Sequence, residues 1–152
     1  MTRLHARVPL RWSDFDAYAH VNNAAMLRIL EEARIQAFWP RDDEDTDDDD
    51  TTGVAIMDSR PGAEFNMVIA KQTIEYLVSV PYLRAALDVE MWIGRMGGAS
   101  LEIEYEVYSP EGTSPRTLFT RAATTIVMVT AATGRPARIH PDQRAAWTPY
   151  VE

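Results

Sequence analysis

Apolar and polar residues alternate along several segments of this chain, as they do in strands with one buried face. Near the N-terminus, apolar residues occupy every second position from Leu4 to Trp12, which is the period of two that predicts a strand. Pro9 lies inside this segment and has no backbone N–H to donate. The strand is therefore expected at an edge of its sheet.

Strand patterns dominate the second half of the chain. The clearest one runs from Leu101 to Val107, where four apolar residues alternate with three glutamates, so one face should be core and the other water. Gly97-Gly98 and the Pro110–Pro115 segment have the composition of turns. We expect strands at Gly53–Asp58, Met67–Val80, Leu87–Met96, Leu101–Val107 and Leu118–Thr130.

One helical pattern interrupts the strands, between about Ala24 and Trp39. Asn22 and Asn23 are suitable N-caps for it, and Pro40 ends it. One apolar face is formed by residues spaced three and four apart: Met26, Ile29, Leu30, Ala33 and Ala37. A second, short helix is expected at Pro141–Trp147. A helix followed by consecutive strands predicts an α+β fold, in which one long central helix packs on an antiparallel sheet.

Length and composition favour a single domain over residues 1–152. The chain has 46% hydrophobic residues, which is enough for one modest core, and shows no repeat or linker. It has no cysteine, which excludes disulfides and cysteine nucleophiles and fits a reducing compartment. No apolar run approaches a membrane span, and no signal-peptide pattern begins the chain. We therefore expect a cytoplasmic protein with no membrane partner.

The net charge of −8 comes from one acidic run, Asp42–Asp50, which holds eight acids. Such a block repels itself and buries nothing, so we expect a disordered loop at residues 41–52. The overall charge argues against a nucleic-acid partner. The run lacks the glycine turn and terminal glutamate of a calcium loop, and the three histidines are scattered. No metal and no cofactor is expected.

The segment before the long helix, Arg11–Asn23, concentrates the chemistry of the chain. Within ten positions it places two aspartates, a histidine and two asparagines, and it ends where the helix must begin. The first turn of a helix offers unpaired backbone N–H groups that can stabilise a developing oxyanion. An ionised carboxylate beside such a helix end is an arrangement suited to catalysis, although an isolated Asp-x-Asp would be read as a turn.

This segment resembles the signature of the 4-hydroxybenzoyl-CoA and acyl-CoA thioesterase family of the hotdog fold. That signature is usually Asp-x-Asp-x-x-Gly-His-Val-Asn-Asn-x-x-Tyr, followed by an apolar helix that ends Glu-x-Ala-Arg. The positions that match are Asp14, Asp16, His20, Val21, Asn22, Asn23, Glu32, Ala33 and Arg34. Weaker similarity continues downstream, in order, at Ile74-Glu75-Tyr76, Asp88-x-Glu90, Gly97-Gly98-Ala99-Ser100 and Gly134-Arg135-Pro136.

The resemblance implies a hotdog fold with a curved sheet, and it implies roles for named residues. Asp16 takes the position of the catalytic carboxylate, as nucleophile or as general base, and the backbone N–H of Asn23 is the expected oxyanion donor. Asp14 would organise the loop. The residues expected to bind substrate are His20, Val21, Asn22, Met26 and Tyr76. The family also implies a homodimer or a dimer of dimers, with each active site at the interface between two chains.

Three positions depart from the signature: Ala19 replaces the glycine, Met26 the tyrosine and Ile29 a commonly aromatic residue. If the glycine serves a positive φ, alanine there strains the loop; if it serves close packing, alanine narrows the pocket. Met26 should give a softer pocket wall, which favours an acyl chain over an aryl ring.

The leading functional prediction is a thioesterase that hydrolyses an acyl-CoA or acyl-carrier thioester. The alternatives are a non-catalytic acyl-binding hotdog protein, for which Ala19 is the best support, and a hotdog hydratase or dehydratase, whose Gly-Asp-x-Asn-Pro-x-His motif is absent. Four basic residues are unranked candidates for holding CoA: Arg60, Lys71, Arg84 and Arg95.

Overall fold

A computed structural model of the chain describes residues 1–38 and 61–152. In this part of the chain five strands form one antiparallel sheet, in the order β1-β3-β4-β5-β2. Two short 3-10 turns, η1 (Trp12–Asp14) and η2 (Thr148–Tyr150), complete the structure. The helices and strands are β1 (Leu4–Val8), α1 (Asn23–Phe38), β2 (Phe65–Tyr76), β3 (Leu87–Met96), β4 (Ser100–Tyr108), β5 (Leu118–Thr130) and α2 (Pro141–Trp147).

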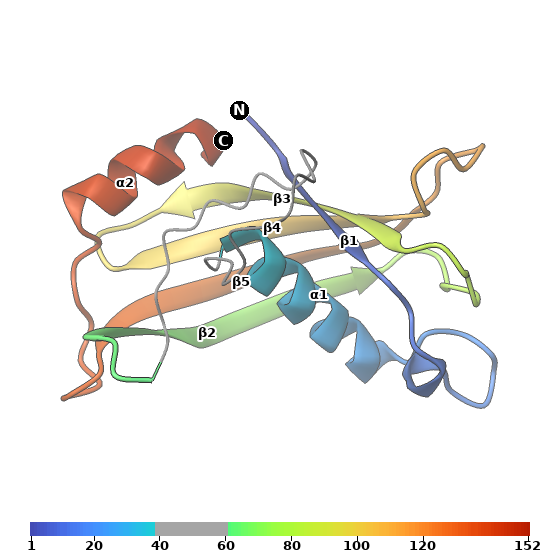
Figure 1. Cartoon of the computed structure of the whole chain (residues 1–152), viewed down its shortest axis with the longest axis horizontal. Helices are drawn as coiled ribbons and strands as arrows, with labels where there is room; N and C mark the ends of the chain where they lie inside the picture. The colour runs from blue at the N-terminus through green and yellow to red at the C-terminus, as the bar shows by residue number, and fades with distance from the viewer. Residues whose placement is uncertain (39–60) are drawn as a thin grey trace, which may run out of the picture.

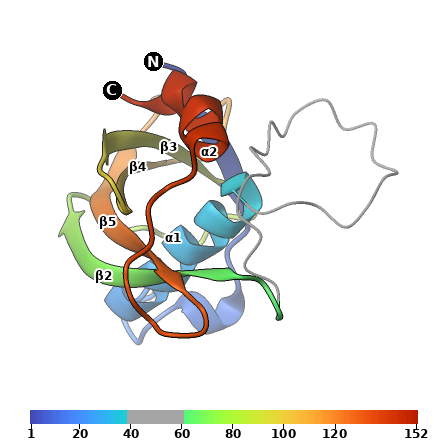
Figure 2. The same ribbon diagram turned by 90° about the vertical axis from the view of Figure 1, so that its left-hand side faces the viewer.

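The sheet curves around α1, which lies on its concave side (Figures 1 and 2). The expected α+β class and antiparallel sheet are confirmed, and the arrangement is that of a hotdog fold. The expectation of one long central helix is met only in part. The 16 residues of α1 extend about 24 Å, against about 44 Å for the 13 residues of β5, and α1 contacts chiefly β1 and β3. Most residues of β2 are exposed, and only Phe65, Met67 and Ile74 are half-buried against the core.

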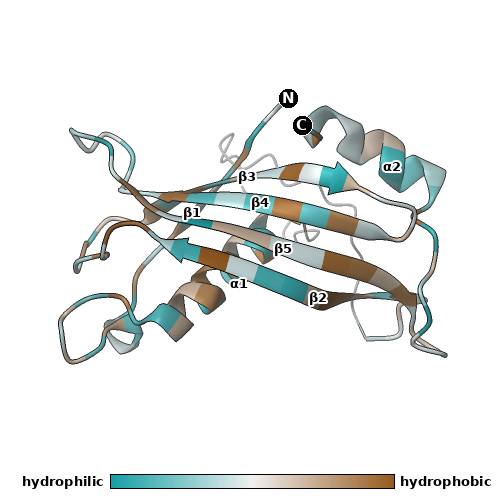
Figure 3. Ribbon diagram, turned by 180° about the vertical axis from the view of Figure 1, so that it is seen from behind, coloured by the Kyte–Doolittle hydropathy of each residue, from teal (hydrophilic) through white to brown (hydrophobic). Residues whose placement is uncertain are grey.

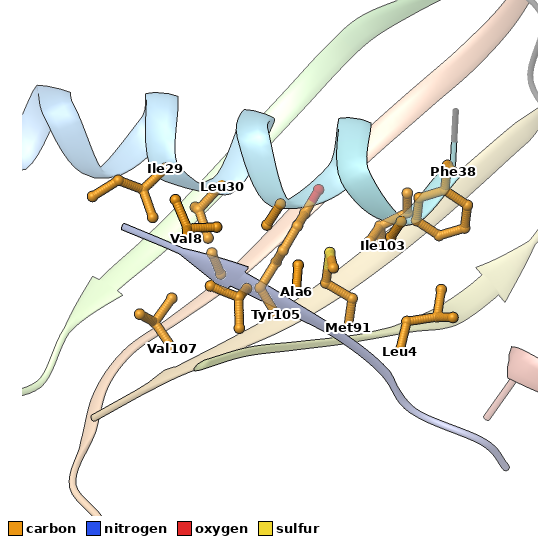
Figure 4. Packing of buried hydrophobic residues seen from close by; sticks show 14 of the residues in the cluster. Leu4, Ala6, Val8, Ile29, Leu30, Phe38, Met91, Ile103, Tyr105 and Val107 are labelled. Atoms are coloured by element: carbon orange, nitrogen blue, oxygen red, sulfur yellow. The ribbon is translucent and has the colours of Figure 1, made fainter. Parts of the chain in front are cut away.

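The core forms where α1 meets β1, β3 and β4, and Figure 4 shows this packing. The apolar face predicted for the helix is buried, as expected. A charged residue of the helix is buried with it: Arg34 donates from its Nη1 to the Tyr105 hydroxyl at 3.1 Å. In Figure 4 the Tyr105 oxygen points from the sheet toward α1. This hydrogen bond gives the buried guanidinium a partner inside the core.

The first strand is shorter than its alternation predicts. β1 ends at Val8, and Trp12 lies in η1 with 82% of its surface exposed instead of on a buried strand face. Pro9 follows directly after the strand and cannot donate a ladder hydrogen bond, which is the physical reason for the early end. The residues after Pro9 therefore lie in the loop that carries the signature motif.

The convex face of β3 is buried, although the sequence places acidic residues there. Asp88 and Glu90 are each only 7% exposed, because Arg116 pairs with both carboxylates and Arg3 pairs with Glu90. Figure 3 shows this face, where hydrophilic and hydrophobic segments are mixed. His5 contacts Asp88 at 3.0 Å, and the ligand atoms of His5, Asp88 and Glu90 lie within 4.8 Å of one another. The arginines already neutralise the two carboxylates, so the cluster is an ion-pair network.

Glu106 on β4 belongs to the same network and makes a testable contribution to stability. Its carboxylate accepts hydrogen bonds from Arg3 at 2.6 Å, Tyr108 at 2.8 Å and Arg121 at 3.3 Å. Burial by itself would raise the pKa of the Glu106 carboxyl, but these donors outweigh burial and hold the pKa below its ordinary value. A depressed folded-state pKa means that the contribution is present above the unfolded pKa of about 4.3 and is lost as pH falls through the folded pKa.

Glu106→Gln should therefore lower the free energy of unfolding at pH 7 by about 1–2 kcal/mol, because charge-assisted hydrogen bonds are lost and the new amide faces a guanidinium. Its stability should also fall less steeply than the parent's below about pH 4.5. Urea unfolding at pH 3.5, 5 and 7 measures both effects. Glu111→Gln is the control, since Glu111 pairs with Arg7 at an exposed site and should contribute little. Equal pH slopes for parent and Glu106→Gln would contradict the prediction.

Two expected features are not tested by the structure, and one strand ends earlier than predicted. The strand expected at Gly53–Asp58 and the acidic loop at residues 41–52 fall outside the described residues. β2 ends at Tyr76 and not at Val80, because the N–H groups of Leu77 and Val78 both donate to the Phe119 carbonyl, at 2.9 and 3.1 Å. The chain after β2 thus turns toward β5 and α1. No helix within the described residues is long and apolar enough to cross a membrane.

Candidate active site

The signature motif folds into a tight loop in front of α1. The Asn22 N–H donates to the Asp14 carbonyl at 2.7 Å, Phe15 and Val21 form an antiparallel bridge, and the Asp16 N–H donates to the His20 carbonyl at 3.0 Å. Residues 17–19 therefore form the tip of a small hairpin. This pairing places Asp16 beside His20, close in the chain to the start of the helix.

Ala19 adopts the left-handed conformation, with φ of 58°. Of the two reasons considered for a glycine here, the structure gives the first, because this φ is one that glycine adopts without the steric cost of a Cβ. The departure from the signature is therefore a local backbone strain. It leaves the loop in the conformation that the signature glycine would favour.

Ala19→Gly should raise the free energy of unfolding by up to about 1 kcal/mol, since the left-handed strain of about 1–2 kcal/mol is larger than the entropy cost of a new glycine. Thermal and urea unfolding measure this. The matched control is Ala17→Gly, an exposed residue of the same loop without a positive φ, which should lower stability by about 0.5–1 kcal/mol. Destabilisation by both substitutions would show that the strain at Ala19 is not relieved.

Asp16 is partly buried and carries one internal hydrogen bond. Its Oδ1 accepts from the Tyr18 N–H at 2.8 Å, which is an Asx-turn that fixes the side chain within the loop. Within residues 1–38 and 61–152 no other group donates to this carboxylate. Its second oxygen therefore remains available to a water molecule or a substrate.

The N-terminus of α1 supplies the second element of the site. Asn22 is the helix cap, since its Oδ1 accepts from the Ala24 N–H at 2.8 Å. Asn23 occupies the first helical position, and in the described part of the chain its N–H donates no hydrogen bond. The Asn23 carbonyl accepts from the Tyr76 hydroxyl at 2.8 Å, which ties the end of β2 to the helix. Partial burial raises the pKa of this Tyr76 phenol, so it stays a donor at neutral pH.

A cavity of about 400 Å³ lies between the loop, the helix N-terminus and the segment that follows β2. Six residues predicted from the sequence line it: Asp16, His20, Val21, Asn23, Met26 and Tyr76. Asn22, predicted to bind substrate, caps the helix and is not among the lining residues. The lining also includes residues that the sequence did not indicate: Tyr18, Leu77, Val78, Ser79, Val80 and Thr120.

The basic residues proposed for CoA lie away from this cavity. Lys71, Arg84 and Arg95 are exposed and do not line it, and Arg60 is outside the described residues. The cavity is lined by one carboxylate, an exposed imidazole, several uncharged polar side chains and several apolar ones. No lysine or arginine lines the described cavity, so it offers no ammonium or guanidinium group to the phosphates of a carrier.

Comparison with solved structures finds the same fold in other proteins. The PA2801 protein from Pseudomonas aeruginosa, a proposed thioesterase, is 29% identical, with 94% of this chain and 96% of that chain covered and a TM-score of 0.73. The 1,4-dihydroxy-2-naphthoyl-CoA thioesterase Slr0204 from Synechocystis shares the fold at 14% identity, with 97% and 96% covered and a TM-score of 0.76. The DHNA-CoA thioesterase from Staphylococcus aureus does so at 15% identity, with 98% and 91% covered and a TM-score of 0.73.

No curated protein matches the sequence. The family model of the Thioesterase-like superfamily matches residues 10–147, which includes the signature loop, the helix and every strand after β1. Membership in this family supports thioester hydrolysis as the general chemistry of the chain. On this match, over most of its length, the chain belongs to the Thioesterase-like superfamily.

Proposed function

We propose that this protein hydrolyses acyl-CoA or acyl-carrier thioesters, with Asp16 as the catalytic carboxylate and the Asn23 N–H as the oxyanion donor. One observation carries the proposal: a carboxylate with an open oxygen and an unpaired helix N–H line the same cavity. An enzyme of acyl transfer needs both groups within reach of one carbonyl. We further propose that it works in the cytoplasm, as the absence of cysteine suggests.

The reaction divides between these groups. The thioester carbonyl oxygen would accept from the Asn23 N–H, where the positive end of the α1 dipole stabilises the negative charge of the tetrahedral intermediate. Asp16 would act by one of two routes. As a general base it removes a proton from an attacking water; as a nucleophile it forms a mixed anhydride that water then opens. In both routes the C–S bond breaks, and the products are a carboxylic acid and a free thiol.

A non-catalytic acyl-binding protein is the main competing proposal. Its best support is Ala19, if alanine at this position narrows the pocket. The positive φ of Ala19 favours the strain explanation instead, and the cavity of about 400 Å³ has room for an acyl group. The hydratase alternative has no such observation in its favour.

Release of free thiol from a panel of acyl-CoAs and acyl-carrier proteins tests the proposal. Steady production of one thiol per acid from at least one substrate, absent in a no-enzyme control, is the expected result. Tight acyl-CoA binding by calorimetry without any thiol release would favour the acyl-binding protein. Conversion of an enoyl-CoA with its thioester bond intact would favour the hydratase.

A further inference from the structure

Thr120 places a buried hydroxyl at the cavity, on the concave face of β5. The residue is 1% exposed and lines the cavity. In the sheet it lies between Tyr76 on β2 and Val107 on β4, which are its cross-strand neighbours. It shares the cavity with Met26 and Val80, both of which are buried.

The Thr120 hydroxyl has no hydrogen-bond partner in the part of the chain that the structure describes. Thr124, four residues further along the same strand face, has a hydroxyl that is sealed from solvent without a partner. The Thr120 hydroxyl differs from that of Thr124, because it is not completely shut off from solvent. Since the residue is almost fully buried and lines the cavity, the remaining access to this oxygen is from the cavity itself. The hydroxyl is thus a polar group directed at whatever fills that space.

Thr120 lies at a distance from the groups proposed to react with the thioester, Asp16 and the Asn23 N–H. Tyr76 lies between Thr120 and the start of α1, because its hydroxyl donates to the Asn23 carbonyl at 2.8 Å and its backbone is paired with Thr120. Thr120 therefore lies roughly one tyrosine side chain from the helix N-terminus. A thioester carbonyl held by the Asn23 N–H would put the acyl group, and not the reacting atoms, beside Thr120.

We propose that Thr120 is a specificity residue that selects acyl groups bearing a hydroxyl over the corresponding plain acyl groups. The inference rests on the proposed function, because it assumes that the cavity receives the acyl part of a thioester. A plain alkyl chain would cover the Thr120 hydroxyl and leave it without a partner, which is unfavourable. A hydroxyl on the acyl chain can both donate to it and accept from it. Sites of this kind discriminate strongly against the analogue that lacks the polar group.

The test compares hexanoyl-CoA with 3-hydroxyhexanoyl-CoA and 6-hydroxyhexanoyl-CoA, in the parent and in Thr120→Val and Thr120→Ser. Valine keeps the volume and removes the hydroxyl, and serine keeps the hydroxyl. In the parent, kcat/KM should favour at least one hydroxylated substrate by about tenfold or more. Thr120→Val should abolish this preference and Thr120→Ser should retain it. Equal preference in parent and Thr120→Val would overturn the proposal.

A binding experiment keeps this test separate from the question of catalysis. The non-hydrolysable thioethers hexyl-CoA, 3-hydroxyhexyl-CoA and 6-hydroxyhexyl-CoA are titrated into the same three proteins by calorimetry. A preference that is present in the parent and lost in Thr120→Val supports the role of Thr120 even if no thioester is hydrolysed, in which case only the proposed enzyme activity fails. Thiol release without any such preference has the opposite meaning: the activity stands and Thr120 is not a specificity residue.

Discussion

Asp16→Asn should reduce thioester hydrolysis by about 10³-fold or more while leaving the fold intact. The substitution removes the only carboxylate that lines the described cavity, and with it either the general base or the nucleophile. Asparagine keeps the side-chain oxygen that accepts from the Tyr18 N–H, so the loop conformation should survive. Thiol release measures the loss, and circular dichroism and the melting temperature check the fold.

Asp14→Asn is the matched control for this experiment. Asp14 is two residues away in the same loop, but its Oδ2 accepts from the Arg11 N–H at 2.7 Å and its carbonyl accepts from Asn22. It therefore organises the loop, and its substitution should cost much less activity than that of Asp16. If Asp16→Asn kept most of the parent turnover on its best substrate, Asp16 would not be the catalytic carboxylate.

Most of the site that the sequence predicts is local in the chain, and Tyr76, which the resemblance implied, is the exception. Asp16, His20 and Asn23 fall within eight positions, so one loop and the first turn of a helix are enough to bring them together. The spacing of Met26 in the helix pattern likewise fixes the side of α1 on which it lies. For these residues, turn chemistry and helix periodicity carry the information, and both are readable without any tertiary contact.

Of the lining residues that the sequence did not indicate, Tyr18 lies in the local loop, whereas Thr120 and the segment after β2 are placed by strand register, which alternation alone does not determine. Thr120 meets Tyr76 only because β2 and β5 pair in one particular alignment, and β2 stops at Tyr76 because the next two N–H groups bond to Phe119. Neither alignment nor strand end follows from alternation, since a strand pattern continues to Val80. In a strand rich in β-branched residues, the sequence does not distinguish a threonine whose hydroxyl faces a pocket from one whose hydroxyl does not.

The buried acids of β3 illustrate the same limit on the opposite face. Alternation predicts polar positions at Asp88 and Glu90, and it does so correctly, but it cannot predict that they are covered. Arg116, which covers them, lies 28 and 26 residues further along the chain. Such ion pairs depend on the path of the β4–β5 connection. They bury the acidic residues of β3, which the alternation would place in solvent.

We expect the protein to form a homodimer in which two β2 strands pair edge to edge. β2 is 12 residues long and pairs only with β5 among the described strands, so its outer edge presents unpaired backbone donors and acceptors. Val68 and Ile69 on this strand are 44% and 43% exposed, as suits residues that a second copy covers. The cavity lies at the end of the same strand, with Tyr76 and the segment after it in its wall. A partner joined at β2 would therefore adjoin the site and could complete it.

Val68→Lys should dissociate this dimer and lower thiol release in proportion, because it replaces an apolar side chain with a charged one on the strand that would form the seam, and each copy contributes one such charge. Light scattering and the thioesterase assay, run side by side across a dilution series, measure both quantities. Ala145→Lys is the control. It adds the same charge at an exposed position of α2, which lies near β3 and away from β2 (Figures 1 and 2), and it should change neither the oligomeric state nor the thiol release. A monomeric Val68→Lys protein with full activity would refute the shared site, because it would show that Asp16 and the Asn23 N–H suffice within a single chain.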